Sequence, residues 1–434
     1  MTVSRRSVLA AAAATTGSYA LTGCVGARRD RQPSQGPLRL MVVGVSGRGG
    51  DNLAAVAKEH IAVLCDVDRE RLAKAGESFP DARRVVDYRE VLQDPSALEQ
   101  LDGVVISTPD HSHFLPAMLA MAGGLDVYCE KPLAHTVVQA RRLAQTAAAR
   151  GAITQMGTQI HANENYHRVV EAIRGGAVGA VREVIVFVNG TDWSATEPPK
   201  QAPLPDTLAW DLWLGPVTPR PYAPDYHPAG WRRYWSFGGG TTADMACHYV
   251  DLAFWALQLD APVSLQADGV EPHPVCAPAA LRCVYDFPAR GERPAVTLHW
   301  HAGKDRPKQA LAERGLDGWT NGVLFVGDDG WLISDYTRHE IGPEARKAAW
   351  RAPAPYLPVV KSHHGEWLDG CRARRKPSCE FGYAAALTET VLLANVAFRA
   401  ARGRRLQWDA ASLRTDLQAA NDLLDEAARS GFQV

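Results

Sequence analysis

Strand-like and helix-like segments alternate from Leu38 to about residue 155, and this alternation most limits the possible folds. The strand-like segments are short apolar runs, and the segments between them have helical periodicity. Each helix returns the chain to the same end of the sheet, so the strands run parallel. Residues 38–156 are therefore predicted to form a doubly wound α/β domain with helices on both faces. Its strands are expected at residues 38–43, 61–65, 85–86, 104–107, 126–129 and 152–155.

A second domain is predicted at residues 157–409, where the rhythm changes. A long strand at residues 181–188 precedes a Trp-, Pro- and Gly-rich stretch that has little periodicity. Later strand candidates follow one another without helices, which predicts an α/β domain with a large, open, mostly antiparallel sheet. These candidates are residues 263–269, 281–287, 295–301, 322–327 and 331–334, and helices are expected at 166–174, 383–402 and 411–430. The last helix would make residues 410–434 a C-terminal helix.

Length and composition agree with two folded domains. The 434 residues exceed what one hydrophobic core usually holds. With 46% hydrophobic and 22% charged residues, the chain can bury a large core, which excludes a disordered protein. Its 47 basic and 48 acidic residues give a net charge of -1, so no nucleic-acid partner is expected.

The turn after the first strand has the small residues that a dinucleotide site needs. It reads Gly44-Val45-Ser46-Gly47-Arg48-Gly49 and departs from the G-x-G-x-x-G pattern at Ser46. Small residues let the backbone and a helix N-terminus approach a pyrophosphate, and Arg48 could reach a phosphate. Asp66 ends the second strand, where a carboxylate binds the adenosine ribose and repels a 2′-phosphate. NAD is therefore the expected cofactor, with Arg69 leaving NADP as an alternative.

Three motifs together resemble one known family. They are Ser107-Thr108-Pro109-Asp110-His111-Ser112-His113, Cys129-Glu130-Lys131-Pro132-Leu133, and Gly238-Gly239-Gly240 leading into Asp244-Met245-Ala246-Cys247-His248. They are similar to motifs of the glucose–fructose oxidoreductase, inositol dehydrogenase and rhizopine-catabolism family, written Gfo/Idh/MocA. The similarity spans nearly all of residues 38–409. The combination is specific, because the last two motifs lie far apart in the chain and both match.

The resemblance implies a Rossmann domain and an α/β domain with the nicotinamide ring between them. It implies an oxidoreductase acting on a sugar, polyol or glycoside, and a homodimer or homotetramer formed through the open sheet. In such enzymes the residue corresponding to Lys131 binds the reacting hydroxyl, and those corresponding to Asp244 and His248 hold the substrate and move the proton. The other motif residues expected at the cofactor, besides Lys131, are Thr108, Pro109, His111 and Glu130.

The three catalytic candidates suit this chemistry. A spacing of four places Asp244 and His248 on one face of a helix, about one turn apart. A histidine, with an ordinary pKa of about 6.5, can accept the alcohol proton. A lysine ammonium beside the alcohol favours the developing alkoxide.

Residues 192–237 hold five of the twelve tryptophans, which is typical of a carbohydrate cleft. Aromatic rings stack on the C–H faces of sugars, although about half of these rings are expected only to anchor the irregular loop. The predicted substrate-binding residues are Tyr226, His227, Arg232 and Trp235.

Zinc in the same cleft is an alternative. Its possible ligands are His227, Cys247, His248, His363 and His364. Cys247 and His248 are adjacent, so they point about 100° apart on a helix, and His363 is expected to begin a helix. No metal ligands are therefore assigned.

The first 24 residues resemble a twin-arginine export signal with a lipoprotein ending. Ser4-Arg5-Arg6-Ser7-Val8-Leu9 precedes an apolar stretch that ends in Leu21-Thr22-Gly23-Cys24. Cleavage there would leave a lipid on Cys24 as the membrane contact and residues 25–37 as a flexible tether. The protein is therefore expected in the periplasm or anchored to a membrane as a lipoprotein.

Export leaves three hypotheses open, because outside the cytoplasm a nicotinamide cofactor must be tightly held and returned to its starting state. The first is a sugar or polyol oxidoreductase. The second is a glycoside hydrolase that uses zinc, or that oxidises the sugar, eliminates the aglycone, adds water and reduces the sugar again. The third is a carbohydrate-binding lipoprotein without turnover, which the presence of Lys131, Asp244 and His248 disfavours.

Overall fold

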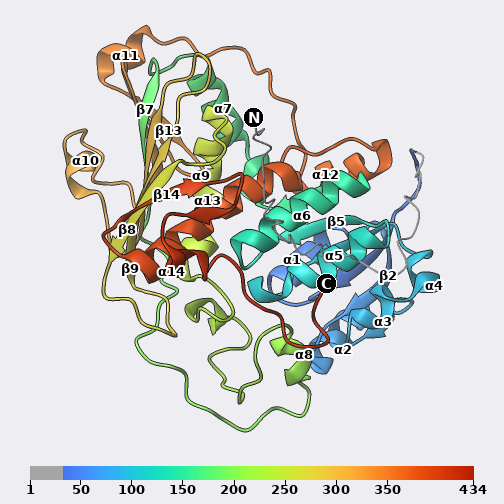
Figure 1. Ribbon diagram of the computed structural model, residues 1–434. Coiled ribbons are helices and arrows are strands. Elements are labelled where there is room, and N and C mark those ends of the chain that lie inside the picture. The colour runs from blue at the N-terminus through green and yellow to red at the C-terminus, as the bar shows by residue number, and fades with distance from the viewer. Residues whose placement is uncertain (1–32) are drawn as a thin grey trace, which may run out of the picture.

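The computed structural model describes residues 33–434, so the expected export signal and most of the tether lie outside the described residues. The first domain contains a six-stranded parallel sheet in the order β3-β2-β1-β4-β5-β6 (Figure 1). Its strands are β1 (Arg39–Val43), β2 (His60–Cys65), β3 (Arg83–Val85), β4 (Gly103–Ile106), β5 (Asp126–Glu130) and β6 (Thr154–Gly157). The predicted Rossmann sheet is confirmed.

Helices cover both sides of this sheet, so the strands are apolar on both faces. Met41 and Val43 point into one apolar layer, while Leu40 and Val42 point into the other. The first domain supplies α1 (Arg48–Ala55), α2 (Arg69–Ser78), α3 (Arg89–Leu92), α4 (Pro95–Leu98), α5 (Phe114–Ala122) and α6 (Val137–Arg150).

A helix from late in the chain, α12 (His363–Ala373), also packs on this first sheet. Its Trp367 is fully buried in the layer that contains Leu40 and Val42, and the indole Nε1 donates to the Ile153 carbonyl at 3.2 Å. The first domain is therefore completed by a segment that lies over two hundred residues after its last strand.

The second domain is built on a nine-stranded sheet in the order β13-β12-β11-β7-β10-β9-β8-β14-β15. Among these strands β7 and β10 pair in parallel and the other pairs are antiparallel, which confirms a mostly antiparallel sheet. The strands are β7 (Val181–Val188), β8 (Ser264–Gly269), β9 (Ala280–Phe287), β10 (Val296–Gly303), β11 (Asn321–Gly327), β12 (Gly330–Ser334), β13 (His339–Gly342), β14 (Arg405–Asp409) and β15 (Arg414–Thr415).

Helices connect this sheet to the first domain. They are α7 (Glu164–Arg174), α9 (Gly240–Leu257) and α13 (Phe381–Ala401). In Figure 1, α13 lies between the second sheet and α6, and it contacts α6, α9 and β8. Shorter helical segments are η1 (Asp110–Ser112), η2 (Gln159–Ala162), α8 (Trp210–Leu214), η3 (Gly230–Arg233), α10 (Lys308–Ala312), α11 (Glu344–Ala349) and α14 (Gln418–Asn421).

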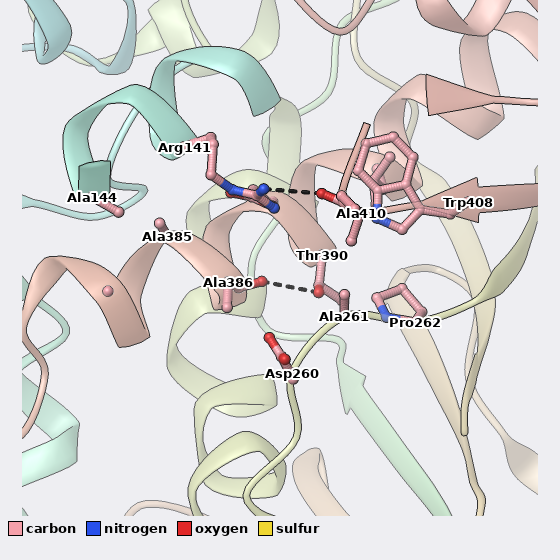
Figure 2. Close-up of a pocket in the computed structure, with 14 residues that line it drawn as sticks. Arg141, Ala144, Asp260, Ala261, Pro262, Ala385, Ala386, Thr390, Trp408 and Ala410 are labelled. Carbon is pink, nitrogen blue, oxygen red and sulfur yellow. Dashed lines mark hydrogen bonds and ion pairs between the residues drawn. The ribbon is translucent and has the colours of Figure 1, made fainter. Parts of the chain in front are cut away.

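Helix α13 is the one described helix that is long and apolar enough to cross a membrane, but 83% of its apolar stretch is buried inside the protein. A partly buried ion pair joins it to α6, because Arg141 donates to both carboxylate oxygens of Glu389 at 2.6 and 2.7 Å. Arg141 also donates to the Ala410 carbonyl at 2.9 Å, beside a cavity of about 390 Å³ (Figure 2). These contacts make α13 a core helix at the junction of the two domains.

The predicted C-terminal helix at residues 411–430 is wrong. This segment forms the short strand β15 and the one-turn helix α14. Asn421 accepts hydrogen bonds from the backbone N–H of Thr415 at 2.7 Å and from its hydroxyl at 3.0 Å. Such side-chain bonds compete with the regular backbone bonds of a helix, so a longer helix does not form.

Candidate active site

A cavity of about 730 Å³ lies at the carboxyl ends of the first sheet's strands. Turns after β1, β2, β4 and β5 form one wall, and α9 with residues 212–213 and 227–232 forms the other. The strand order reverses between β1 and β4, which is where open α/β sheets bind their ligands. The cavity therefore has the position of a dinucleotide site with a second compartment between the domains.

The glycine turn is shaped by close backbone contacts. Gly44 has φ +83°, and a Cβ there would lie 2.7 Å from the Ser107 carbonyl oxygen. A Cβ at Gly49 would collide with the Gly44 carbonyl, so Gly49 supports the turn without lining the cavity. Ser46, Gly47 and Arg48 do line it at the N-terminus of α1.

Asp66 lies in the cavity wall at the end of β2, with both carboxylate oxygens engaged by backbone. They accept from the N–H groups of Val45 at 3.0 Å and Asp68 at 2.9 Å. Burial raises the pKa of Asp66, and these two hydrogen bonds oppose the rise. The nearby arginine in the wall is Arg71 rather than Arg69, and it donates to the Ser46 hydroxyl at 3.4 Å.

Lys131 and Asp244 meet in the cavity wall from different domains. Lys131 Nζ lies 2.5 Å from Asp244 Oδ1 and 2.6 Å from the Asp244 carbonyl oxygen. The same carboxylate accepts from Arg232 Nε at 3.2 Å and from Trp193 Nε1 at 2.7 Å. Burial opposes ionisation of Asp244, but Lys131 and Arg232 outweigh it and hold the pKa well below its usual range. Asp244 is therefore a permanent anion between two cations.

His248 lies one turn after Asp244 on α9 and lines the same cavity. Burial, reinforced by the Lys131 ammonium, lowers the pKa of His248 to about 3, so the ring is neutral at neutral pH. Its Nδ1 is buried and has no hydrogen-bond partner among the described residues. A neutral imidazole in the wall of a cavity can accept a hydrogen bond or a proton from a ligand.

Asp110 also lines the cavity, and sequence reasoning did not single it out as a site residue. Burial raises the pKa of Asp110 to about 7, while Arg232 and Lys131 act in the opposite direction. Its only sequence signal was its place in the Thr108-Pro109-Asp110-His111 motif, just after a predicted strand. Tyr336 is a second wall residue without such a signal, since it comes from the turn between β12 and β13.

The other motif residues divide between the wall and its support. Thr108, Pro109 and Glu130 line the cavity, and Glu130 accepts from Asn52 Nδ2 at 2.9 Å and Gln159 Nε2 at 2.6 Å. His111 lies outside the cavity, where its Nε2 is 2.9 Å from the Trp213 carbonyl. His111 thus connects the first motif to the Trp-rich stretch of residues 192–237, called here the aromatic loop.

Two of the four predicted substrate residues reach the cavity. His227 and Arg232 line it, together with Trp213 and Trp231. Tyr226 is buried in an aromatic cluster with Trp210, Trp213, Tyr234 and Phe237. Trp235 points away from the cavity, and its Nε1 donates to the His273 carbonyl at 2.9 Å.

The side chains considered for zinc do not come together. Cys247 is buried in the core on α9, while His363 Nε2 is 2.7 Å from the Met156 carbonyl and His364 Nε2 is 2.9 Å from Asn52 Oδ1. The metal-ligating side chains that do cluster among residues 33–434 are His161, Asp251 and Cys379, a set that the sequence did not indicate.

Comparisons with known proteins agree with both domains. The chain matches the description "Oxidoreductase family, NAD-binding Rossmann fold" over residues 38–158 and "Oxidoreductase family, C-terminal alpha/beta domain" over residues 167–291. D-apiose dehydrogenase from Paraburkholderia graminis is 37% identical over 123 residues, which are 27% of this chain and 31% of that protein. Inositol 2-dehydrogenase from Rhodococcus jostii is 27% identical over 149 residues, which are 33% of this chain and 40% of that protein.

The fold also resembles solved structures. The WlbA dehydrogenase from Bordetella pertussis, in complex with NADH and UDP-GlcNAcA, has a TM-score of 0.61 at 18% identity. The match covers 87% of this chain and 99% of that chain, which shows a shared fold. The chain spans less than half the length of the two curated relatives described above.

Proposed function

This chain belongs to the Gfo/Idh/MocA oxidoreductase family, and we propose that it moves a hydride between a bound nicotinamide cofactor and a hydroxyl-bearing carbon of a sugar, polyol or glycoside. One observation carries the proposal. Lys131, Asp244 and His248 converge from two domains on the cavity that also contains the glycine turn. Hydrolysis and non-catalytic carbohydrate binding have no specific support from this geometry.

The residues present fit a dinucleotide. The turn at Gly44 excludes any side chain, and the Thr108 hydroxyl in the same cavity is buried without a hydrogen-bond partner among the described residues. Ser46, Gly47 and Arg48 would hold the pyrophosphate, and Asp66 the adenosine ribose. The cofactor, when bound, supplies the acceptor or donor of the hydride. The Asp66 carboxylate favours NAD, while the nearby Arg71 guanidinium would tolerate a 2′-phosphate.

The side chains between the domains supply the proton chemistry. Lys131, held by Asp244, places its ammonium where an alkoxide develops and lowers the energy of that charge. The neutral His248, which lines the cavity, is placed to accept the hydroxyl proton. Asp110 is a second acceptor in the same wall, and its pKa of about 7 suits proton transfer at neutral pH. We assign the hydroxyl proton to His248, with Asp110 as the alternative acceptor in the same wall.

A carbohydrate substrate is supported by the wall opposite the glycine turn. Trp213 and Trp231 belong to that wall, and His227 and Arg232 add polar groups. The matched relatives include dehydrogenases named for D-apiose and inositol. Export through the twin-arginine route, a lipid on Cys24, a tightly held cofactor and an oligomer formed through the open sheet remain part of the proposal on sequence grounds.

The test begins with the purified protein and no added cofactor. Any bound nucleotide is released by denaturation and identified as NAD or NADP. The native protein is then given a panel of free sugars, polyols and chromogenic glycosides while reduced nicotinamide and aglycone are followed together. Reduction of the cofactor by at least one free sugar or polyol is expected. Aglycone release without net reduction would instead identify a hydrolase, and no response with bound cofactor would contradict the substrate class.

A further inference from the structure

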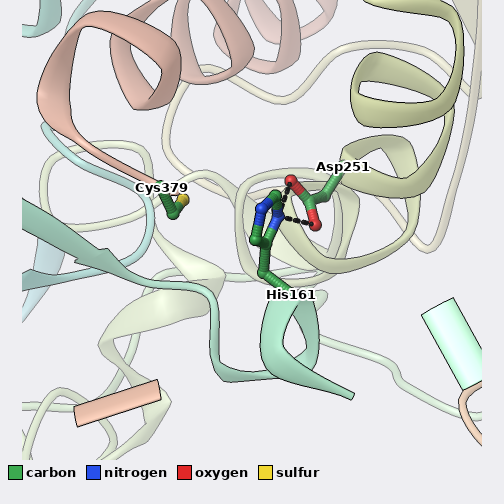
Figure 3. A group of neighbouring side chains, drawn as sticks. All are labelled: His161, Asp251 and Cys379. Atoms are coloured by element: carbon green, nitrogen blue, oxygen red, sulfur yellow. Dashed lines mark hydrogen bonds and ion pairs between the residues drawn. The ribbon is translucent and has the colours of Figure 1, made fainter. Parts of the chain in front are cut away.

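A group of fully buried metal-ligating side chains lies outside the lining of the cavity, farther along α9. It consists of His161 in η2, Asp251 in α9 and Cys379 just before α13, called here the buried triad (Figure 3). No more than 1% of any of the three side chains is exposed. None of them lines the candidate active site, so the proposed dehydrogenase chemistry does not explain them.

The Asp251 carboxylate fixes the tautomer of His161. Its two oxygens lie 2.9 and 3.0 Å from His161 Nδ1, and they accept the proton that Nδ1 carries. Tyr383 holds the carboxylate from the other side, with its hydroxyl donating to Asp251 Oδ1 at 2.6 Å. With the proton on Nδ1, the lone pair of the imidazole is on Nε2. A carboxylate bound to one ring nitrogen while the other faces a metal is the usual arrangement for a histidine ligand.

The free nitrogen of His161 has no protein partner. Nε2 is buried, and no described residue makes a hydrogen bond to it. The ring is also held in place by stacking on Trp255, with centroids 3.9 Å apart. A buried nitrogen with a lone pair and a fixed orientation costs free energy unless a donor or a cation meets it.

Cys379 supplies a sulfur donor at this position. One ligand atom from each member of the buried triad lies within 4.8 Å of the others, and Figure 3 shows the imidazole between the thiol and the carboxylate. Ligand atoms of one zinc ion lie roughly 3.5 Å apart when its bonds are about 2.0–2.3 Å long. Small side-chain rotations would therefore bring the thiol and the imidazole onto one ion while Asp251 stays on Nδ1.

We propose that the buried triad binds a borderline transition-metal ion, with Zn²⁺ as the natural occupant. His161 Nε2 and Cys379 Sγ are its primary ligands, and Asp251 orients the imidazole through Nδ1. Imidazole, thiolate and carboxylate are the donors that Zn²⁺ takes, whereas Ca²⁺ and Mg²⁺ prefer oxygen alone. On binding, the Cys379 thiol releases one proton to solvent and the thiolate bonds to the metal.

Such an ion would join three segments that are far apart in the sequence. His161 follows the last strand of the first sheet, Cys379 precedes α13, and Asp251 lies one turn beyond His248 on α9. The ion would have a structural role, because it would fix the helix that carries Asp244 and His248 without touching the cavity. This inference does not depend on the substrate or cofactor of the proposed function.

The test measures metal in the full chain without an affinity tag. Protein from zinc-supplemented cells is expected to contain about one Zn²⁺ per chain after gel filtration. Replacing the metal with Co²⁺ should give the sulfur-to-cobalt charge-transfer absorption that reports thiolate ligation. Cys379→Ala should lose this absorption and most of the metal. Cys283→Ala, a change at another fully buried cysteine in β9, should keep both.

The wild-type protein alone can overturn the proposal, whether or not a variant folds. Less than a tenth of an ion per chain, together with no charge-transfer absorption, would show that the buried triad is a hydrogen-bonded cluster without metal. Bound metal whose absorption survives Cys379→Ala would place the ion elsewhere and would also overturn it. His161→Gln deletes the second ligand. Metal content equal to that of wild type in this variant would also place the ion elsewhere and overturn the proposal.

Discussion

Lys131 Nζ lies 2.5 Å from Asp244 Oδ1, so the lysine of the first domain is held by a carboxylate of the second. Both side chains are nearly buried, with 11% and 13% of their surfaces exposed. The ion pair thus closes the candidate active site across the domain boundary. It also explains why Asp244 stays ionised despite its burial.

Asp244→Asn should leave the Lys131 ammonium and the Arg232 guanidinium without their shared anion. Removing one partner of a buried ion pair costs about 3–5 kcal/mol of stability. We expect a fall of this order in the free energy of unfolding and a decrease in kcat/KM. Denaturant unfolding and steady-state kinetics measure the two effects. Asp328→Asn, which removes an exposed ion pair with Arg182, should change neither by a comparable amount.

His248→Ala should reduce turnover by about 10²–10⁴-fold, the usual contribution of a positioned acid or base. The cofactor should remain bound, because His248 faces the compartment between the domains. Nicotinamide content and kcat are measured on the same preparation. His299→Ala on the second sheet is the matched control, and it should retain both activity and cofactor. Unchanged turnover in the His248 variant would refute its role in proton transfer.

Asp110→Asn should change the pH dependence of the reaction. Burial raises the pKa of Asp110 to about 7, so the wild-type rate of alcohol oxidation should rise as pH passes through this value and the carboxylate forms. The variant should lose this ionisation and be slower at high pH. A wild-type profile that is identical to the variant's would show that Asp110 does not carry the proton.

The same raised pKa affects stability with a defined sign. The folded protein binds the Asp110 proton more tightly than the unfolded chain does, so this group favours folding at low pH. Its contribution is lost as pH rises from about 4 to about 7. Asp110→Asn should therefore be more stable than wild type at pH 8, relative to their difference at pH 4. Thermal unfolding at both values measures the change.

Asp66→Ala should weaken the discrimination against NADP. The change removes the carboxylate that would repel a 2′-phosphate and leaves Arg71 near it. We expect the ratio of NAD to NADP affinity to fall by about tenfold, or about 1.4 kcal/mol. Titration of cofactor-free protein gives both affinities. Asp81→Ala, at an exposed position between α2 and β3, should leave the ratio as it is in wild type.

Periodicity predicted most of the fold because the buried strands and long helices are determined by their own residues. The six strands of the first sheet were found in this way, and so was the long core helix α13. The C-terminal helix was predicted wrongly because bonds between Asn421 and Thr415 do not follow from local periodicity. Within residues 33–434, the features that the sequence did not predict depend on contacts between distant segments.

The candidate site shows the same limit. The spacing of Asp244 and His248 on one helix was enough to predict that both reach the same cavity. The aromatic loop has no such regularity, so its composition could not distinguish Trp231 in the wall from Trp235 facing His273. Tyr336 reaches the wall through the pairing of β12 with β11, which no local pattern reveals.

The packing of α12 on the first sheet sets an order for synthesis on the ribosome. Helices α1 and α2 cover part of one face, but its part around Tyr128 and Ile153 stays uncovered until Trp367 has been translated and has left the exit tunnel. The packing of the first domain is therefore completed only after most of the second domain has been made. A nascent chain that ends before residue 363 would expose Tyr128 and Ile153, and would be a substrate for chaperones.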